Sequence, residues 1–259
     1  SGTGGGFKKF IASEIDINDA SRNIKSSEQD KAKAAGIEFI ELPVAFDGLS
    51  VIVSLENDWV DYLTVAELHA IWKPESEVKT WADVRAGWPE IEIRLYGPGT
   101  DSGTFDYFTY AINGKEQSSR ADFTASEDDN VLVQGIAGDA GSLGYFGFAY
   151  YVENKDKLKI VPIDGGAGPI EPTLVTINDG SYAPLSRPIF IYINAASLDD
   201  PAVTKFVELY LEQAAPLAEE AGYVALPAEA YRKGAERVAQ RVVGTAYGEN
   251  ASITNLIVE

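Results

Sequence analysis

Cysteine and methionine are both absent from this chain of 259 residues, and histidine occurs once. Without cysteine, the chain forms no disulfide bond, thiolate metal site or cysteine nucleophile. A single histidine excludes a multi-histidine metal site, and a catalytic triad would depend on His69 alone. No apolar run approaches the roughly 20 residues that cross a bilayer. Since neither a methionine nor a basic, apolar leader is present, we expect a processed or truncated product without a signal peptide.

Acidic residues outnumber basic residues by 40 to 21, which gives a formal net charge of −19. Such a surface repels nucleic acid and anionic membranes, so no nucleic-acid partner is expected. The acidity favours solubility, and 45% hydrophobic residues with 11% aromatics are typical of a globular protein. An anionic ligand would have to be attracted at short range by local dipoles and one or two buried basic groups.

The stretch from residue 96 to residue 108 is the first candidate for ligand binding. Residues 91–95 alternate apolar and charged side chains, as in a strand, and residues 105–113 repeat apolar side chains at helical spacing. Ser102, Gly103 and Thr104 open this helix, where free N–H groups and the positive end of the macrodipole favour an anion. The simpler alternative is an ordinary N-cap, in which Ser102 or Thr104 serves only the helix.

Two other polar turns have the same character. Residues 1–6, Ser-Gly-Thr-Gly-Gly-Gly, lead into an amphipathic helix and deliver unobstructed amide groups to its start, unless they are a flexible linker. Residues 18–23, Asn-Asp-Ala-Ser-Arg-Asn, follow a short strand. Because ligands of open α/β sheets bind outside the carboxyl ends of strands, the three turns together predict one binding site.

Strand patterns that alternate with helix patterns predict an α/β fold with a mostly parallel sheet, and the length suggests two lobes. We expect strands at residues 37–45, 49–55, 143–152 and 189–193, and helices at 64–73, 126–136, 203–211 and 227–242. Residues 154–188 show little periodicity of apolar residues, and we expect them to cross back to the first lobe and to form surface loops. The break at residues 46–48 is the candidate crossing point between lobes. Lobe 1 is therefore predicted to comprise residues 1–47 and 155–259, and lobe 2 residues 48–154.

The order and spacing of these motifs resemble the phosphate-binding proteins of bacterial ABC phosphate importers. The resemblance rests on residues 1–8 (SGTGGGFK), 19–22 (DASR) and 100–105 (TDSGTF), and it extends through residues 138–151, 185–188 and 238–248. It implies a two-lobed periplasmic-binding-protein-like fold of type II, with a hinge and a central ligand cleft. The implied function is high-affinity, non-catalytic binding of inorganic phosphate for uptake.

The same resemblance implies the partners and the location. The ligand would be inorganic phosphate, and the protein partner the membrane permease of an ABC phosphate transporter. The chain would act as a monomer, without a cofactor or metal, in the periplasm or at the extracellular face of the cell envelope.

Site residues follow from the resemblance position by position. The Thr3 hydroxyl and the Gly4 amide would donate to phosphate. Ser21 stands where many members have an aspartate that accepts the proton of hydrogen phosphate, and Arg22 is the neighbouring base.

On the other lobe, Ser102, Gly103 and Thr104 match the anion-binding helix start of the family. Pro98 and Thr100 stand where many members have an arginine and an aspartate. The positive charge is therefore assigned to Arg22, and the proton acceptor to Asp101.

A further departure concerns the start of the chain. Family members have a strand–helix–strand unit before the glycine turn, whereas this sequence opens at the turn. We therefore expect lobe 1 to be incomplete at its N-terminal side, with an exposed sheet edge.

Two other functions stay open. One is binding of another oxyanion, such as sulfate, molybdate or tungstate, on a similar frame. The other is a phosphoryl-transfer or serine hydrolase enzyme that uses the helix start at Ser102. Against the enzyme stand the missing histidine partner, the absence of a Gly-x-x-x-x-Gly-Lys-Ser/Thr motif and the absence of a metal-ligand cluster.

Overall fold

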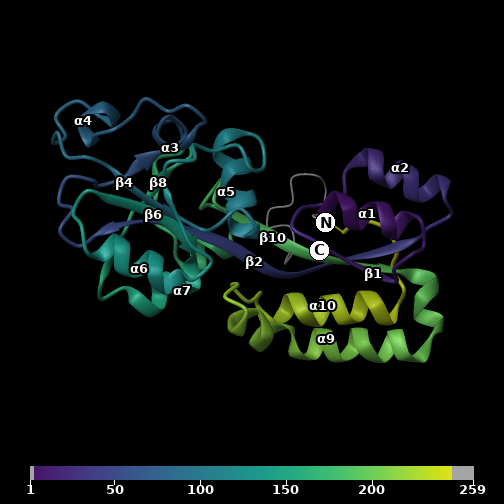
Figure 1. The fold of residues 1–259 in the computed structure, drawn as a ribbon. Coiled ribbons are helices and arrows are strands. Elements are labelled where there is room, and N and C mark those ends of the chain that lie inside the picture. Colours follow the sequence, from purple (N-terminus) through teal and green to yellow (C-terminus); the bar gives the residue numbers. More distant parts are fainter. Residues whose placement is uncertain (1–2, 247–259) are drawn as a thin grey trace. The chain divides into compact units, whose positions relative to one another are not determined.

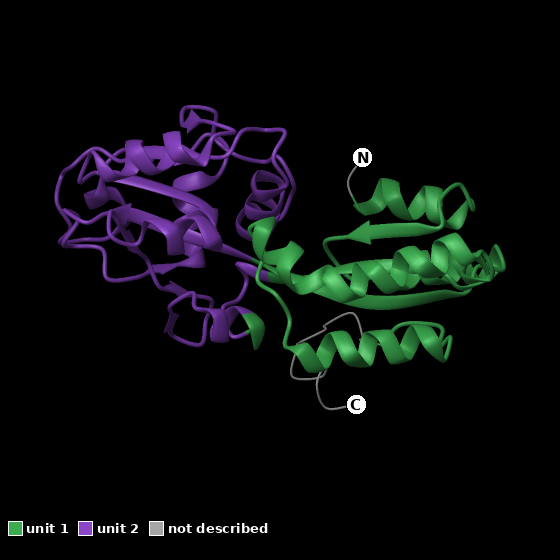
Figure 2. Ribbon diagram, turned by 90° about the horizontal axis from the view of Figure 1, so that it is seen from below, with its two compact units in different colours: residues 1–47, 178–180, 187–259 green, residues 48–177, 181–186 purple. Residues whose placement is uncertain are grey.

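The computed structural model describes residues 3–246, and the chain divides into two compact units (Figure 2). Unit 1 comprises residues 1–47, 178–180 and 187–259, and unit 2 comprises residues 48–177 and 181–186. The first break lies after Asp47, at the predicted crossing point. Residues 155–177 and 181–186 belong to unit 2 and not to lobe 1 as predicted. Two strands within residues 155–177 pair with strands of unit 2.

Unit 1 is built on a sheet with helices on both faces (Figure 1). Its strands are β1 (Ile17–Ala20), β10 (Ser186–Asn194) and the first part of β2 (Phe39–Ser54), in the order β1-β10-β2. Helices α1 (Thr3–Ile11) and α2 (Ser26–Ala34) cover one face. The other face is covered by α9 (Pro201–Glu220) and α10 (Ala228–Ala239), and the short 3₁₀ helix η1 (Ala195–Asp199) follows β10.

Alternation along β10 supplies both cores of unit 1, since successive side chains of a strand point to opposite faces. Phe190 and Tyr192 join the cluster beneath α1, and Ile191 and Ile193 join the cluster beneath α9 and α10. The first cluster is rich in aromatic rings and the second is aliphatic. The sheet is therefore fixed from both sides by apolar burial.

Unit 2 has its own sheet, in the order β2-β6-β4-β5, with β7 also paired to β2. The strands are the second part of β2, β4 (Arg94–Gly97), β5 (Thr124–Ala125), β6 (Ser142–Gly147) and β7 (Leu158–Ile160). A small second sheet consists of β3 (Leu63–Thr64), β8 (Ile163–Asp164) and β9 (Pro169–Ile170). The helices are α3 (Val65–Trp72), α4 (Trp81–Val84), α5 (Gly103–Asn113), α6 (Asp129–Ala137), α7 (Phe148–Asn154) and α8 (Leu174–Asn178).

The strands predicted at residues 37–45 and 49–55 form one continuous strand, β2, in which all 16 residues are buried. Complete burial removes the alternation that would have marked residues 46–48 as strand. The sheets are also mixed, not mostly parallel as predicted. β1 pairs antiparallel with β10, β2 pairs antiparallel with β6 and β7, and β4 pairs parallel with β5 and β6.

Three other elements differ from prediction. The strand predicted at residues 143–152 ends at Gly147 and continues as α7. Residues 154–188, predicted as a crossing with loops, contain β7, β8, β9 and α8, which are too short to show periodicity. The helix predicted at residues 203–211 runs from Pro201 to Glu220. Among the described residues, no helix combines the length and apolar character that crossing a membrane requires.

Two helical glycines of unit 1 provide a matched test of this packing. A Cβ at Gly6 would lie 2.0 Å from Oδ1 of the buried Asn18, whereas a Cβ at Gly234 would lie 3.7 Å from Leu42. We expect Gly6→Ala to destabilise the protein by about 1–3 kcal/mol through overpacking. Gly234→Ala should be neutral or stabilise by about 0.5–1 kcal/mol through helix propensity. Urea unfolding measures both, and equal effects would contradict the packing of α1 against β1.

Candidate functional site

The four site residues predicted in the first 47 residues lie together in unit 1. Thr3 is the first residue of α1, and its Oγ1 accepts a hydrogen bond from the Ser21 N–H at 3.1 Å and lies 3.0 Å from Ser21 Oγ. A Cβ at Gly4 would lie 3.8 Å from Nη2 of Arg22. The start of α1 and the turn after β1 therefore form one cluster of donors, in which the helix adds its free N–H groups.

Arg22 is held by a carboxylate that the sequence analysis missed. Its Nη1 and Nη2 donate to Oε2 and Oε1 of Glu28, each at 2.9 Å, and Nη1 also donates to the Asn23 carbonyl. The guanidinium lies 5.4 Å from the ring centre of Phe7, so cation–π attraction adds to the pair. Glu28 also accepts from the Lys25 N–H at 2.9 Å and so caps α2. The acidic residue six positions after Arg22 was the available signal for this pair.

The two roles of Glu28 determine its protonation. Burial acts to raise the pKa of the Glu28 carboxyl, but hydrogen bonds from Arg22 and from the Lys25 N–H, with the charges of both residues, outweigh it. The pKa therefore lies below the usual 4.5. The side chains of Arg22 and Glu28 are 31% and 15% exposed, so the pair is screened only in part.

The other four predicted residues lie together in unit 2, at the start of α5. Ser102 is the N-cap, and its Oγ accepts from the Thr104 N–H at 3.2 Å. Ser102 therefore caps the helix, and its hydroxyl proton is still available as a donor. A Cβ at Gly103 would meet no atom within 4 Å, and both Gly103 and Asp101 are exposed. The helix start is therefore open to a ligand.

Asp106, in the first turn of α5, is another acidic group that the sequence analysis missed. Within the described part of the chain, its Oδ1 is one of the buried side-chain oxygens without a hydrogen-bond partner. It lies three residues after Gly103, which places the two on neighbouring positions of the helix surface.

The alternative of a serine-based enzyme depends on His69. This histidine is exposed on α3, and its Nδ1 lies 2.9 Å from Asn113 Oδ1 and 3.2 Å from the Ile112 carbonyl. His69 is therefore a surface residue. Over residues 3–246, no group of three or more histidine, aspartate or glutamate side chains is suited to hold a metal ion.

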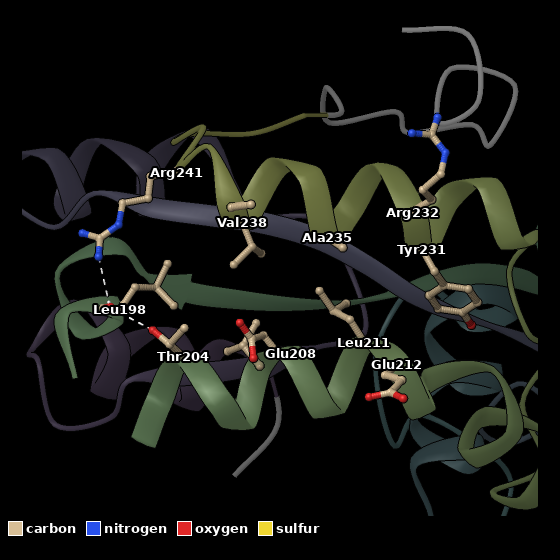
Figure 3. Close-up of a pocket in the computed structure, with 12 residues that line it drawn as sticks. Leu198, Thr204, Glu208, Leu211, Glu212, Tyr231, Arg232, Ala235, Val238 and Arg241 are labelled. Atoms are coloured by element: carbon tan, nitrogen blue, oxygen red, sulfur yellow. Dashed lines mark hydrogen bonds between the residues drawn. The ribbon is translucent and has the colours of Figure 1, made fainter. Parts of the chain in front are cut away.

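A cavity of about 670 Å³ lies between α9 and α10 of unit 1 (Figure 3). Val207, Leu211 and Val238 contribute apolar side chains to it, and Arg241 and Thr204 donate to the Leu198 carbonyl at 3.0 and 2.8 Å. None of the eight predicted site residues lines this cavity. Its apolar wall makes it unsuitable as an oxyanion site.

Comparison with known proteins identifies the class. A model of the PBP superfamily domain matches residues 1–213. Protein SphX of Synechocystis sp. is 47% identical over 251 residues, which cover 96% of this chain and 75% of that protein. The phosphate-binding protein PstS of Staphylococcus aureus is 44% identical over 233 residues, which cover 89% of this chain and 69% of that protein. The crystal structure of a possible phosphate binding protein from Planctomyces limnophilus matches with a TM-score of 0.89 and 49% identity over 92% of this chain and 85% of that one.

The fold and these matches define a two-lobed α/β binding protein of the PBP superfamily, which confirms the predicted fold class. Within that superfamily, the chain belongs to the PstS-like phosphate-binding proteins. The resemblance that the motifs at residues 1–8, 19–22 and 100–105 carried is thereby confirmed.

The Arg22–Glu28 pair predicts a pH-dependent contribution to stability. Since folding lowers the pKa of Glu28 from 4.5, this contribution is complete above the unfolded value and is lost as the pH falls through the folded value. The free energies of unfolding of the parent and Glu28→Gln should therefore differ most at neutral pH and converge in acid. Urea unfolding at a series of pH values measures this. A difference that stays constant down to acid pH would show that the Glu28 charge is not involved.

Proposed function

We propose that this chain binds inorganic phosphate reversibly and delivers it to the membrane permease of an ABC phosphate importer. The observation that carries the proposal is the composition of the two clusters. Each joins the start of a helix to serine and threonine hydroxyls, in a chain that belongs to the PstS-like family. We further propose that the residues of each cluster are ligands of phosphate.

Hydroxyl and amide donors suit a tetrahedral oxyanion. The Thr3 and Ser21 hydroxyls with the first N–H groups of α1 supply donors from unit 1, and Ser102 and Thr104 with the start of α5 supply donors from unit 2. Each hydrogen bond to a charged ligand contributes about 1.5–3 kcal/mol, so a few of them suffice for tight binding. Helix dipoles add to these donors at short range.

Neutral donors carry most of the proposed binding because the charge of Arg22 is shared with Glu28. The net charge of −19 opposes an approaching anion, but salt screens exposed charges beyond roughly 8–10 Å. Amide and hydroxyl dipoles at contact distance are not screened in this way. Arg22 then contributes orientation and one charge-assisted contact.

An enzyme is not proposed. A serine nucleophile needs an activating base, and the Ser102 hydroxyl instead accepts from the Thr104 N–H while His69 lies beside Asn113. The PstS-like family consists of non-catalytic binding components of transporters.

The proposal extends to location and assembly. Family members face the periplasm or the outside of the cell, and this chain would work there as a monomer. Its acidic surface keeps copies apart, since like charges repel at low ionic strength.

Titration calorimetry with phosphate, sulfate and molybdate tests the function. We expect phosphate to bind most tightly, with one ion per chain. Gly103→Val should weaken phosphate binding by about 100-fold or more, because its side chain fills the space at the helix start and two hydrogen bonds to a charged ligand are worth about 3–6 kcal/mol. Circular dichroism should be unchanged, since the added Cβ meets no neighbour.

The matched control is Tyr110→Ala, which removes an exposed side chain from the same helix and should leave binding intact. Sulfate or molybdate binding more tightly than phosphate would overturn the choice of ligand. Full phosphate binding by Gly103→Val would exclude the start of α5 from the site.

Selectivity tests the proposed role of Asp101. In the proposed role, the Asp101 carboxylate accepts a hydrogen bond from hydrogen phosphate but repels sulfate, which has no proton to donate. Asp101→Asn should therefore narrow the preference for phosphate over sulfate, because an amide can turn its NH₂ group toward sulfate. Competition titrations measure the ratio of affinities. If the variant excludes sulfate as strongly as the parent does, Asp101 is only a loop residue and Asp106 or Asp19 becomes the acceptor to test.

A further inference from the structure

The hydroxyl of Tyr192 joins two parts of unit 1 that are far apart in the sequence. It accepts a hydrogen bond from the Ile24 N–H at 2.8 Å and donates to Oε2 of Glu41 at 2.7 Å. Ile24 ends the turn that carries Ser21 and Arg22. The turn is therefore tied, through one side chain of β10, to a carboxylate on β2.

The ring of Tyr192 also contacts α1. Its centre lies 4.8 Å from that of Phe7 in an edge-to-face arrangement, and 5.7 Å from that of Phe39 at the start of β2. Phe7 in turn lies beneath the Arg22 guanidinium. One fully buried tyrosine thus contacts both elements of unit 1 that carry proposed phosphate donors. Tyr192 touches α1 through its ring and the turn after β1 through its hydroxyl.

Glu41 is an unusual group to find at this place. Its side chain is 0% exposed, and its Oε1 accepts from the Ala246 N–H at 3.1 Å while Oε2 accepts from Tyr192. Burying a carboxylate costs free energy even when it is hydrogen-bonded, so such a group is weak evidence for stability. A carboxylate does polarise a hydroxyl that donates to it, and the hydroxyl oxygen then becomes a better acceptor for the Ile24 N–H.

We propose that Tyr192, oriented by Glu41, is a positioning residue for phosphate binding, which sets the turn of Ser21 and Arg22 against the start of α1. Neither side chain touches the ligand in this account. The inference rests on the proposed function, and it adds two residues that the motifs did not indicate. It also explains why a buried carboxylate is present where an apolar side chain would serve the core.

Two tyrosine-to-phenylalanine variants form a matched pair that tests this role. Tyr192→Phe removes only the hydroxyl and should weaken phosphate binding about five- to tenfold in calorimetric titration, the usual effect of one hydrogen bond. Tyr182→Phe makes the same change at another fully buried tyrosine, whose hydroxyl donates to the Leu49 carbonyl at 2.9 Å in unit 2. Both variants should lower Tm, but Tyr182→Phe should keep the phosphate affinity of the parent.

Glu41→Gln, made in the parent and in Tyr192→Phe, separates positioning from general stabilisation. An amide cannot accept from both Tyr192 and the Ala246 N–H, so the variant should weaken phosphate binding in the parent. It should weaken binding little further in Tyr192→Phe, because Glu41 acts through the tyrosine hydroxyl. If the two substitutions instead reduced phosphate affinity independently, so that their fold-changes multiplied in the double variant, Glu41 would not act through Tyr192.

Equal phosphate affinity of the parent and Tyr192→Phe would overturn the proposal, as would equal losses in the two phenylalanine variants. A parent chain that binds no phosphate would overturn the proposed function instead. In that case, amide hydrogen exchange measured without phosphate still tests whether Tyr192 anchors the turn at Ile24. Faster exchange of the Ile24 N–H in Tyr192→Phe, with no change in Tyr182→Phe, would support the anchoring of the turn, and an unchanged rate would refute it.

Discussion

The hydrogen bonding of β2 is the constraint on which the rest of the structure depends. All 16 residues of this strand are buried, so every unpaired backbone N–H or C=O group would carry a desolvation cost. Pairing is supplied by β10 in unit 1 and by β6 and β7 in unit 2. Because one unbroken strand takes part in both sheets, the chain has to return to it from residues 142–147, 158–160 and 186–194. That requirement explains why unit 1 is discontinuous in sequence.

In the proposed site, an acidic chain binds an anion through two clusters of donors. Both place the first N–H groups of a helix beside small hydroxyl residues, and neither relies on several positive charges. In unit 1, Arg22 is paired with Glu28, which orients the guanidinium and offsets most of its charge. Under the proposed function, phosphate affinity depends on the direction of dipoles at contact distance, where the net charge of −19 has little influence.

Buried and half-buried carboxylates in unit 1 have a common use. Glu28 caps α2 and fixes Arg22, and Glu41 accepts from Tyr192 and from the Ala246 N–H. Each carboxylate accepts hydrogen bonds from two different residues, which an apolar side chain cannot do. These carboxylates fix the positions of neighbouring donors more than they raise the free energy of unfolding.

The sequence alone determined the features that depend on adjacent residues. The opening of α5 at Ser102, Gly103 and Thr104, the glycine-rich start of α1 and the family motifs were all predictable, because caps and turns are set by a few neighbouring side chains. Tertiary structure decided the continuity of β2, the mixed pairing of its sheets and the place of residues 155–177. It also decided the Tyr192–Glu41 contact, which joins residues 151 positions apart. Strand pairing and such contacts are selected by burial among distant segments, and no local pattern encodes which distant partner a strand or a buried carboxylate will meet.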